Sequence, residues 1–267
     1  MEMTLALPLG MLFSGAVAAE RRPLFIFAVA LQGVALLMTN SRGGIISLLA
    51  LIFFLVVVTG FRPAAQNAAG ANSRGALLRA ALGFGLILAL LAGALALGGE
   101  NALSRFFGTV SAEDPTTGRA HFWGIALQVF RAHPLLGAGL GSFALMYTQY
   151  DTRNGLLRVE QVHNDYLQVL TDTGIIGGVL GLLFIYWLLR QGLARRETRD
   201  TYRRGVTTGA LAGCFGVLVH SFFDFTLHTP SNALLFLTLA ALATVGPEVE
   251  KAATAGGKRR KHKSQRQ

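Results

Sequence analysis

The sequence is poor in charged side chains and almost free of cysteine. Only 14% of its 267 residues are charged, whereas a typical soluble domain has about 25%. The single cysteine, Cys214, excludes a disulfide within the chain and a metal site built from cysteines. No internal repeat is visible either. The low charge therefore argues against an ordinary soluble domain.

Apolar sequence is what the chain has in abundance. Hydrophobic residues make up 52% of it, and 32 residues are glycine, which is more frequent in membrane helices than in soluble ones. Most of the apolar stretches reach the roughly 17–25 residues that a helix needs to cross a bilayer. Seven such stretches run over residues 3–19, 23–39, 43–61, 77–98, 170–189, 205–223 and 230–246. We predict an all-α polytopic bundle of about seven transmembrane helices over residues 1–250.

The basic residues predict the orientation of this bundle. Loops on the cytoplasmic side of a membrane protein carry an excess of Lys and Arg. A cytoplasmic C-terminus places 18 of the 24 Lys and Arg inside: Arg21 and Arg22, then Arg62, Arg74 and Arg79, six arginines from Arg190 to Arg204, and seven basic residues from Lys251 to Arg266. The reverse orientation would place these 18 outside. The chain is thus expected to be a multi-pass membrane protein with its C-terminus in the cytoplasm.

The two ends of the chain are interpreted through the membrane as well. The basic tail, residues 251–267, is expected to be disordered and to be attracted to anionic lipid rather than to nucleic acid. Residues 1–19 end in small residues that resemble a signal-peptidase site, but no Lys or Arg precedes them. A cleaved signal peptide is therefore not expected.

One long polar segment, about residues 99–165, is predicted to lie on the extracytoplasmic side of the membrane. Loops of this length in compact proteins are usually functional or disordered. The stretch from Arg119 to Ala132 predicts an amphipathic helix, because Phe122, Trp123, Ala126 and Phe130 share one side at helical spacing. Thr117 could cap its start, and Pro134 follows its end. We interpret it as a helix in the membrane interface, anchored by Trp123.

Two outer arginines are candidates for anion binding. Arg42 lies in a short turn between two spans, and the following Gly43 and Gly44 would let a ligand or helix approach the backbone. An arginine at this depth is costly and usually has a partner. Guanidinium groups bind phosphate oxygens bidentately, so Arg42 could clamp a diphosphate headgroup; the alternative is a snorkelling surface arginine. Arg119 begins its helix, where the dipole disfavours a cation, which hints at a partner anion.

Histidines supply the candidates for proton transfer. His163, beside Asn164 at the outer start of the fifth span, could act as a general base, although a lone histidine can also be structural. His220 and Asp224 stand one turn apart and are expected to pair with each other. The remaining two in the loop, His121 and His133, have no metal-ligand spacing and are interpreted as solvated or capping residues.

A glycine-rich run, residues 137–141, superficially resembles a nucleotide-binding loop. The fingerprint requires G-x-G-x-x-G after a strand. Ser142 occupies the position after Gly141, and no strand is predicted before the run. We interpret it as a flexible turn leading into the stretch from Phe143 to Tyr150.

Four segments together resemble the O-antigen ligase family, which includes O-antigen ligases, related polymerases and protein O-oligosaccharyltransferases. The first is His163-Asn164, followed by Gly174 and Gly177, which resembles the histidine motif of the family. The others are Thr39-Asn40-Ser41-Arg42-Gly43-Gly44, then Gly118-Arg119 with Trp123 and His133 to Gly139, and finally His220 to Phe225 with Pro230 and Asn232. They occur in the family's order and cover residues 39–239.

The resemblance implies a transferase of the bacterial inner (cytoplasmic) membrane, with its active site on the extracytoplasmic side. Its donor would be a glycan on a polyprenyl (undecaprenyl) diphosphate, its acceptor a hydroxyl of lipid A–core, a glycan or a protein, and it would need no cofactor or catalytic metal. By this resemblance Arg42 and Arg119 would stabilise the diphosphate and His163 would act as base or orient the acceptor. Asn164 and Arg158 are expected to contribute to substrate binding.

The chain departs from the family in one respect. Family members usually have more spans than this chain, and the difference lies at the N-terminal side. The resemblance therefore leads us to expect that another polypeptide or an upstream segment supplies further helices for full activity. The alternatives to an enzyme are a polysaccharide or lipid transporter and a truncated, noncatalytic membrane protein of the same family. Ligase and polymerase are not separated by these motifs.

Overall fold

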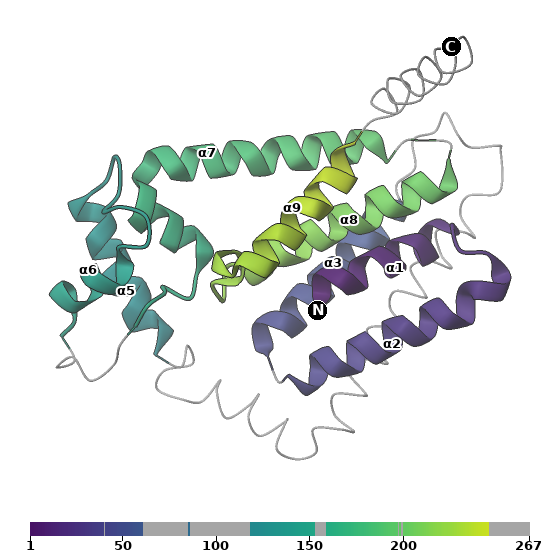
Figure 1. The fold of residues 1–267 in the computed structure, drawn as a ribbon, viewed down its shortest axis with the longest axis horizontal. Coiled ribbons are helices and arrows are strands. Elements are labelled where there is room, and N and C mark those ends of the chain that lie inside the picture. The colour runs from purple at the N-terminus through teal and green to yellow at the C-terminus, as the bar shows by residue number, and fades with distance from the viewer. Residues whose placement is uncertain are drawn as a thin grey trace, which may run out of the picture.

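The computed structural model describes residues 1–39, 41–60, 85, 118–152, 159–196, 198 and 200–245. Within these residues the chain forms eight α-helices, two short 3-10 helices and no strand, as the all-α prediction requires. The elements are α1 (Glu2–Ser14), η1 (Ala19–Arg21), α2 (Arg22–Met38), α3 (Arg42–Gly60), α5 (Arg119–Ala132), α6 (Phe143–Tyr150), α7 (Asp165–Arg195), α8 (Thr201–His220), η3 (Thr226–His228) and α9 (Pro230–Thr244). Figure 1 shows α5 and α6 together at one end of the molecule.

Six of the seven predicted spans coincide with α1, α2, α3, α7, α8 and α9. Residues 77–98 lie outside the described part of the chain, apart from Gly85. Three described helices are long and apolar enough to cross a membrane: Ala19–Met38, Arg42–Gly60 and Asp165–Arg195. Helices α1 and α9 are apolar but shorter. These helices make the chain a membrane protein, while the number of seven spans stays a prediction.

Helices α1 and α8 pack closely through small residues. A Cβ placed on Gly10 of α1 would lie only 2.3 Å from the Cα of Gly209 in α8, and one placed on Gly205 would lie 2.5 Å from the Oγ of Ser14. Such close approach of backbones is typical of helices in lipid, where association depends on van der Waals packing and hydrogen bonds. The small residues thus align the two helices along their length.

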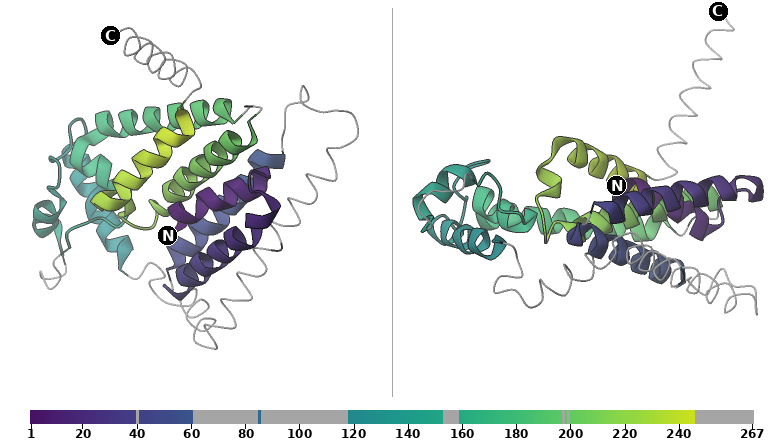
Figure 2. Two further views of the ribbon diagram at one scale, coloured as in Figure 1. Left: turned by 45° about the vertical axis from the view of Figure 1, so that its right-hand side comes forward. Right: turned by 90° about the horizontal axis from the view of Figure 1, so that it is seen from below.

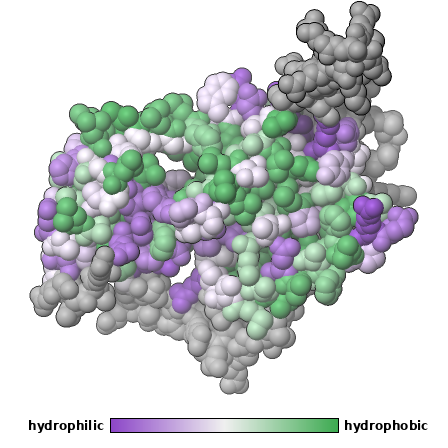
Figure 3. All heavy atoms as spheres, viewed as in Figure 1, coloured by the Kyte–Doolittle hydropathy of each residue, from purple (hydrophilic) through white to green (hydrophobic). Residues whose placement is uncertain are grey.

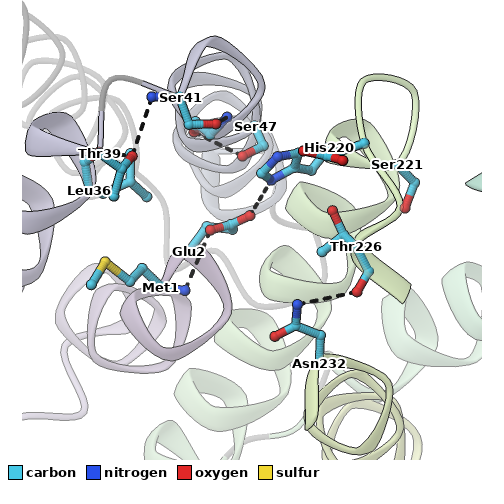
Figure 4. Close-up of polar contacts among 12 residues, drawn as sticks. Met1, Glu2, Leu36, Thr39, Ser41, Ser47, His220, Ser221, Thr226 and Asn232 are labelled. Carbon is cyan, nitrogen blue, oxygen red and sulfur yellow. Dashed lines mark hydrogen bonds and ion pairs between the residues drawn. The ribbon is translucent and has the colours of Figure 1, made fainter. Parts of the chain in front are cut away.

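Four helices, α1, α3, α7 and α8, meet at one end of this bundle. The Glu2 carboxylate pairs with Nδ1 of His220, which brings the start of α1 beside the end of α8 (Figure 4). The Asp165 N–H donates to the carbonyl of Ser221, so α7 begins there too. A Cβ placed on Gly43 would lie 3.0 Å from the His220 ring, so the start of α3 packs against the same residue.

The opposite end of these helices carries basic residues. The Arg196 guanidinium, just after α7, donates to the carbonyl of Val58 near the end of α3. The contact between Ser14 and Gly205 places the end of α1 beside the start of α8. The connections and adjoining helix ends here contain Arg21, Arg22, Arg195, Arg196, Arg203 and Arg204. Charge is therefore distributed unevenly between the two ends of the bundle.

Helix α7 is broken at Gly174, whose backbone adopts φ 64° and ψ −161°. Residues 133–142, between α5 and α6, dock against this break, and we call them the glycine-rich loop. Its Ala138 N–H donates to the carbonyl of Thr171 at 2.8 Å, and the Ile175 N–H donates to the carbonyl of Pro134 at 2.8 Å. Backbone groups released by the break are thus paired by the loop, as a membrane protein requires.

The same loop also binds Asp172, which is buried. The N–H of Gly139 donates to its carbonyl at 3.1 Å and the N–H of Gly141 to its carboxylate at 3.1 Å. The loop forms a turn that leads into α6, as predicted, and these hydrogen bonds hold it against α7. Its glycines allow backbone to approach backbone, since a Cβ on Gly137 would lie 2.4 Å from the carbonyl carbon of Asp172.

Candidate functional site

The candidate site forms around the residues that follow α8. We call residues 221–227 the acidic loop, because Asp224 lies at its centre. In Figure 1 and Figure 2 the end of α8 lies between the α5–α6 end of the molecule and the helices α1 and α3. Figure 3 shows hydrophilic residues gathered in this region, whereas hydrophobic residues cover α7 and α9.

Asp224 brings two of the predicted residues together. Its Oδ1 lies 2.9 Å from Nδ1 of His163, and its Oδ2 lies 3.7 Å from Nη2 of Arg119. Arg119 also donates from Nη1 to the carbonyl of Phe223 at 2.5 Å. The three side chains are about one-third exposed, with values between 31% and 35%, so a ligand could reach them. The position of Arg119 at the start of α5 predicted a partner anion, and the Asp224 carboxylate is one such partner.

The contact with Asp224 determines the tautomer of His163. An ionised carboxylate only accepts hydrogen bonds, so Nδ1 of the ring must carry the proton. The other ring nitrogen, Nε2, then has a lone pair while the ring is neutral. Two aromatic rings lie near the His163 ring. The distance between ring centroids is 6.0 Å for Phe122 and 4.8 Å for Phe225.

The backbone of His163 is unusual. Its φ of 56° makes it the one non-glycine residue with positive φ in the described part of the chain. This left-handed conformation is uncommon outside glycine and costs on the order of 1–3 kcal/mol. Strain of this kind persists only where surrounding contacts hold it, and it clusters at functional sites. The conformation lets the His163 ring meet Asp224 while the chain turns into α7.

Asn164 is the residue that starts α7. Its Oδ1 accepts the N–H of Leu167 at 3.0 Å, which is the geometry of an N-cap. Its Nδ2 donates to the carbonyl of Phe222 at 3.1 Å in the acidic loop. Both groups of the amide therefore have protein partners, and the side chain is buried. The structure gives Asn164 a supporting place behind His163.

Arg42 begins α3 at the same end of the bundle, with an exposed side chain. The next residue, Gly43, packs against the acidic loop, since its Cβ would lie 3.2 Å from the Cβ of Phe223 and 3.0 Å from the ring of His220. Figure 4 shows this ring between Glu2 on one side and the start of α3 on the other. The acidic loop thus contacts His163 and Arg119, and it packs against Gly43, the residue that follows Arg42.

Two expectations about the histidines are wrong, and one is confirmed. His220 pairs with Glu2 rather than with Asp224, whose carboxylate pairs with His163 and Arg119 instead. His121 is not solvated, since its Nε2 lies 2.9 Å from Oδ1 of Asp151. Exposed His133 does follow α5 as its C-cap.

The N-cap of α5 differs from expectation, although the range of the helix does not. The N-cap is Gly118, at φ 91°, rather than Thr117, which lies outside the described residues. The helix itself spans Arg119–Ala132, the range predicted. Its inner face packs on α6 and the segment before α7 through Ile125, Ala126 and Val129. Arg158 lies outside the described residues.

In the part of the chain that the structure describes, no three His, Cys, Asp or Glu residues are grouped so that they could hold a metal ion. The chemistry available at the site is that of an imidazole, a carboxylate and guanidinium groups.

Comparison with known protein families assigns the chain. The sequence profile of the family described as O-antigen ligase matches residues 27–182, which is more than half of the 267 residues. The chain belongs to the O-antigen ligase family. The match includes Arg42, Arg119, His163 and Asn164, and it ends before the acidic loop. No curated protein matches the chain. Membership makes this a membrane protein of a family associated with glycan transfer.

Proposed function

We propose that this member of the O-antigen ligase family transfers a glycan from a polyprenyl diphosphate to an acceptor hydroxyl on the extracytoplasmic face. The observation that carries the proposal is the contact of Asp224 with both His163 and Arg119. It joins a group able to accept a proton to a group able to bind an anion. These are the two needs of a displacement in which a hydroxyl replaces a diphosphate.

The proposed reaction is a single displacement at the anomeric carbon. Nε2 of His163 takes the proton of the acceptor hydroxyl, and the hydroxyl oxygen forms a bond to the anomeric carbon. The bond from that carbon to the phosphate oxygen breaks, and its electron pair leaves with the diphosphate. Asp224 stabilises the imidazolium that forms, through the Nδ1 contact. The configuration at the anomeric carbon inverts.

The leaving diphosphate is proposed to bind at Arg119 and Arg42. A guanidinium has five N–H donors, so the contacts of Arg119 with Phe223 and Asp224 do not exhaust it. Arg42 is exposed at the start of α3, beside the same loop. Arg158 is proposed to assist in binding, as the sequence led us to expect, and Asn164 to support His163.

The donor and the acceptor are proposed by their chemistry. A donor that is already activated as a diphosphate needs no nucleotide and no metal. The acceptor is proposed to be a hydroxyl of lipid A–core, of a growing glycan or of a protein. A strain that lacks this chain should accumulate polyprenyl-diphosphate glycan and lose a surface polysaccharide, and the plasmid-borne chain should restore it. Unchanged polysaccharide and carrier lipid in that strain would overturn the proposal.

The membrane location can be tested by reporter fusions. The basic turns lie one bundle length from the site, so they support a cytoplasmic face opposite to it. Fusions at Gly70, Thr198 and Gly257 are expected to report the cytoplasm, and fusions at Asp114 and Gly155 the extracytoplasmic side. A cytoplasmic signal at Gly155 would place the site in the wrong compartment and overturn the mechanism.

The arginines can be tested by replacement with lysine, which keeps the charge and loses the planar fork. Arg119→Lys and Arg42→Lys should each lower the rate at which the deletion strain regains its polysaccharide, by about 10²-fold. Arg131→Lys, on the exposed side of α5, is the control and should behave like the wild type. A wild-type rate in Arg42→Lys at equal protein level would favour the snorkelling alternative.

A further inference from the structure

One buried carboxylate holds both ends of the acidic loop. Asp165 is 4% exposed. Its Oδ2 accepts the hydroxyl of Ser221 at 2.7 Å and the N–H of Leu227 at 3.0 Å. Ser221 and Leu227 are the first and last residues of the loop, and Asp224 lies midway between them. The backbone N–H of Asp165 also donates to the carbonyl of Ser221 at 2.9 Å.

The other oxygen of this carboxylate has a partner too. Oδ1 of Asp165 lies 2.5 Å from Nδ1 of His228. The hydrogen bond that His228 makes with Asp165 raises the pKa of His228, although partial burial of the ring opposes the rise. In its protonated form His228 would compensate a negative charge on the buried carboxylate, which is costly without a partner. Both oxygens of this carboxylate therefore have partners within the protein.

The residues beside Asp165 support the same junction. Nδ2 of Asn164 donates to the carbonyl of Phe222, and the hydroxyl of Tyr166 donates to the carbonyl of Leu218 at 2.7 Å. Three consecutive residues at the start of α7 thus bind the end of α8 and the acidic loop. Asp165 is the one that reaches both ends of the loop.

We propose that Asp165 is a positioning residue: its carboxylate is a clamp on Ser221 and Leu227, which sets the acidic loop so that Asp224 meets His163 and Arg119. This inference rests on the proposed function, because it explains how the groups of that site are held in place. Asp165 acts through the loop and touches no reacting atom. Loss of its acceptor should let the loop move, and Asp224 with it, while His163 and Arg119 keep their chemistry.

Hydrogen exchange tests the loop without any substrate. In the purified full chain, Asp165→Asn should speed exchange of the Leu227 amide by about ten- to a hundredfold, because a bond to a charged acceptor is weakened. Exchange within α5 should stay as in the wild type. Asp200→Asn is the matched control, because Asp200 caps α8 at the opposite end and also accepts backbone N–H groups. Unchanged exchange at residues 221–227 in Asp165→Asn would overturn the clamp.

Rates of polysaccharide restoration test whether the clamp serves Asp224. We expect Asp165→Asn to lower the rate about tenfold, and to add little to the loss already caused by Asp224→Asn, because both changes act on one unit. Losses that multiply in the double variant would overturn action through Asp224. If Asp165→Asn fails to fold, Ser221→Ala removes one bond to the same oxygen and is measured in the same two ways.

The two proposals can fail separately. A wild-type chain that restores no polysaccharide overturns the proposed function, while the exchange experiment still decides whether Asp165 holds the loop. A wild-type chain that restores polysaccharide, combined with unchanged exchange in both Asp165→Asn and Ser221→Ala, overturns the clamp alone.

Discussion

Replacing His163 with asparagine is expected to lower the rate of glycan transfer by about 10²–10⁴-fold, the contribution typical of a general base. Asparagine suits this test because it tolerates the left-handed backbone that His163 adopts at φ 56°. Its amide cannot take a proton at neutral pH. The loss should therefore come from the missing imidazole and not from the fold. The measurement is the rate at which the deletion strain regains surface polysaccharide, at equal protein level.

Controls separate chemistry from strain. His163→Ala should be as inactive as His163→Asn and less stable, because alanine lacks the tolerance for positive φ. His133→Asn should match the wild type, since His133 is exposed at the end of α5. A near wild-type rate in His163→Asn would contradict the proposed base. A wild-type rate in His163→Gln would show that hydrogen bonding, rather than proton transfer, is what matters.

Local patterns in the sequence predict much of the helical framework. The amphipathic spacing from Arg119 to Ala132 predicts α5 with both of its ends, because the periodicity and Pro134 mark them. The fifth apolar stretch was predicted from residue 170, framed by His163 and Asn164, and α7 begins slightly earlier, at Asp165, because Asn164 is a strong N-cap residue. In each case the signal lies within a few residues of the feature. The long apolar stretches similarly predict α2 and α3.

Asp224 shows where such reasoning fails. Its spacing of four from His220 suggests a pair on one helix face, as side chains at that spacing are neighbours. The helix stops at His220, however, and Asp224 instead meets His163, 61 residues away in the sequence. Nothing local specifies that pairing, which depends on how α7 docks against the end of α8. The one indication in the sequence was Arg119, a cation at the start of a helix, which was expected to have an anionic partner.

The docking of the glycine-rich loop on α7 was not predicted, for the same reason. Gly137, Gly139 and Gly141 all have positive φ, which a flexible turn and a tightly docked one share in sequence. What distinguishes them is the partner, the break in α7 at Gly174. The glycines of the loop and Gly174 of α7 are the sequence signal for this close backbone contact. The signal can be recognised only once the two segments are known to meet.

Gly174→Ala is expected to destabilise the chain by about 3 kcal/mol or more. The backbone at φ 64° and ψ −161° lies in a region that is almost restricted to glycine. The added Cβ would lie 2.4 Å from the carbonyl carbon of Leu135, which is backbone and cannot rotate away. The loop would have to lift from α7 and give up its hydrogen bonds to Thr171 and Asp172.

The effect should reach the candidate site, because the loop connects α5 to α6. If the loop lifts, the C-terminal end of α5 loses its support, and Arg119 at the other end of that helix is displaced from Asp224. Gly181→Ala is the matched control in the same helix, since no atom lies within 4 Å of a Cβ placed there. Unfolding of the purified chain in detergent should show a lower midpoint for Gly174→Ala alone, with polysaccharide restoration lost. Equal midpoints for Gly174→Ala and the wild type would mean that the break in α7 does not depend on glycine.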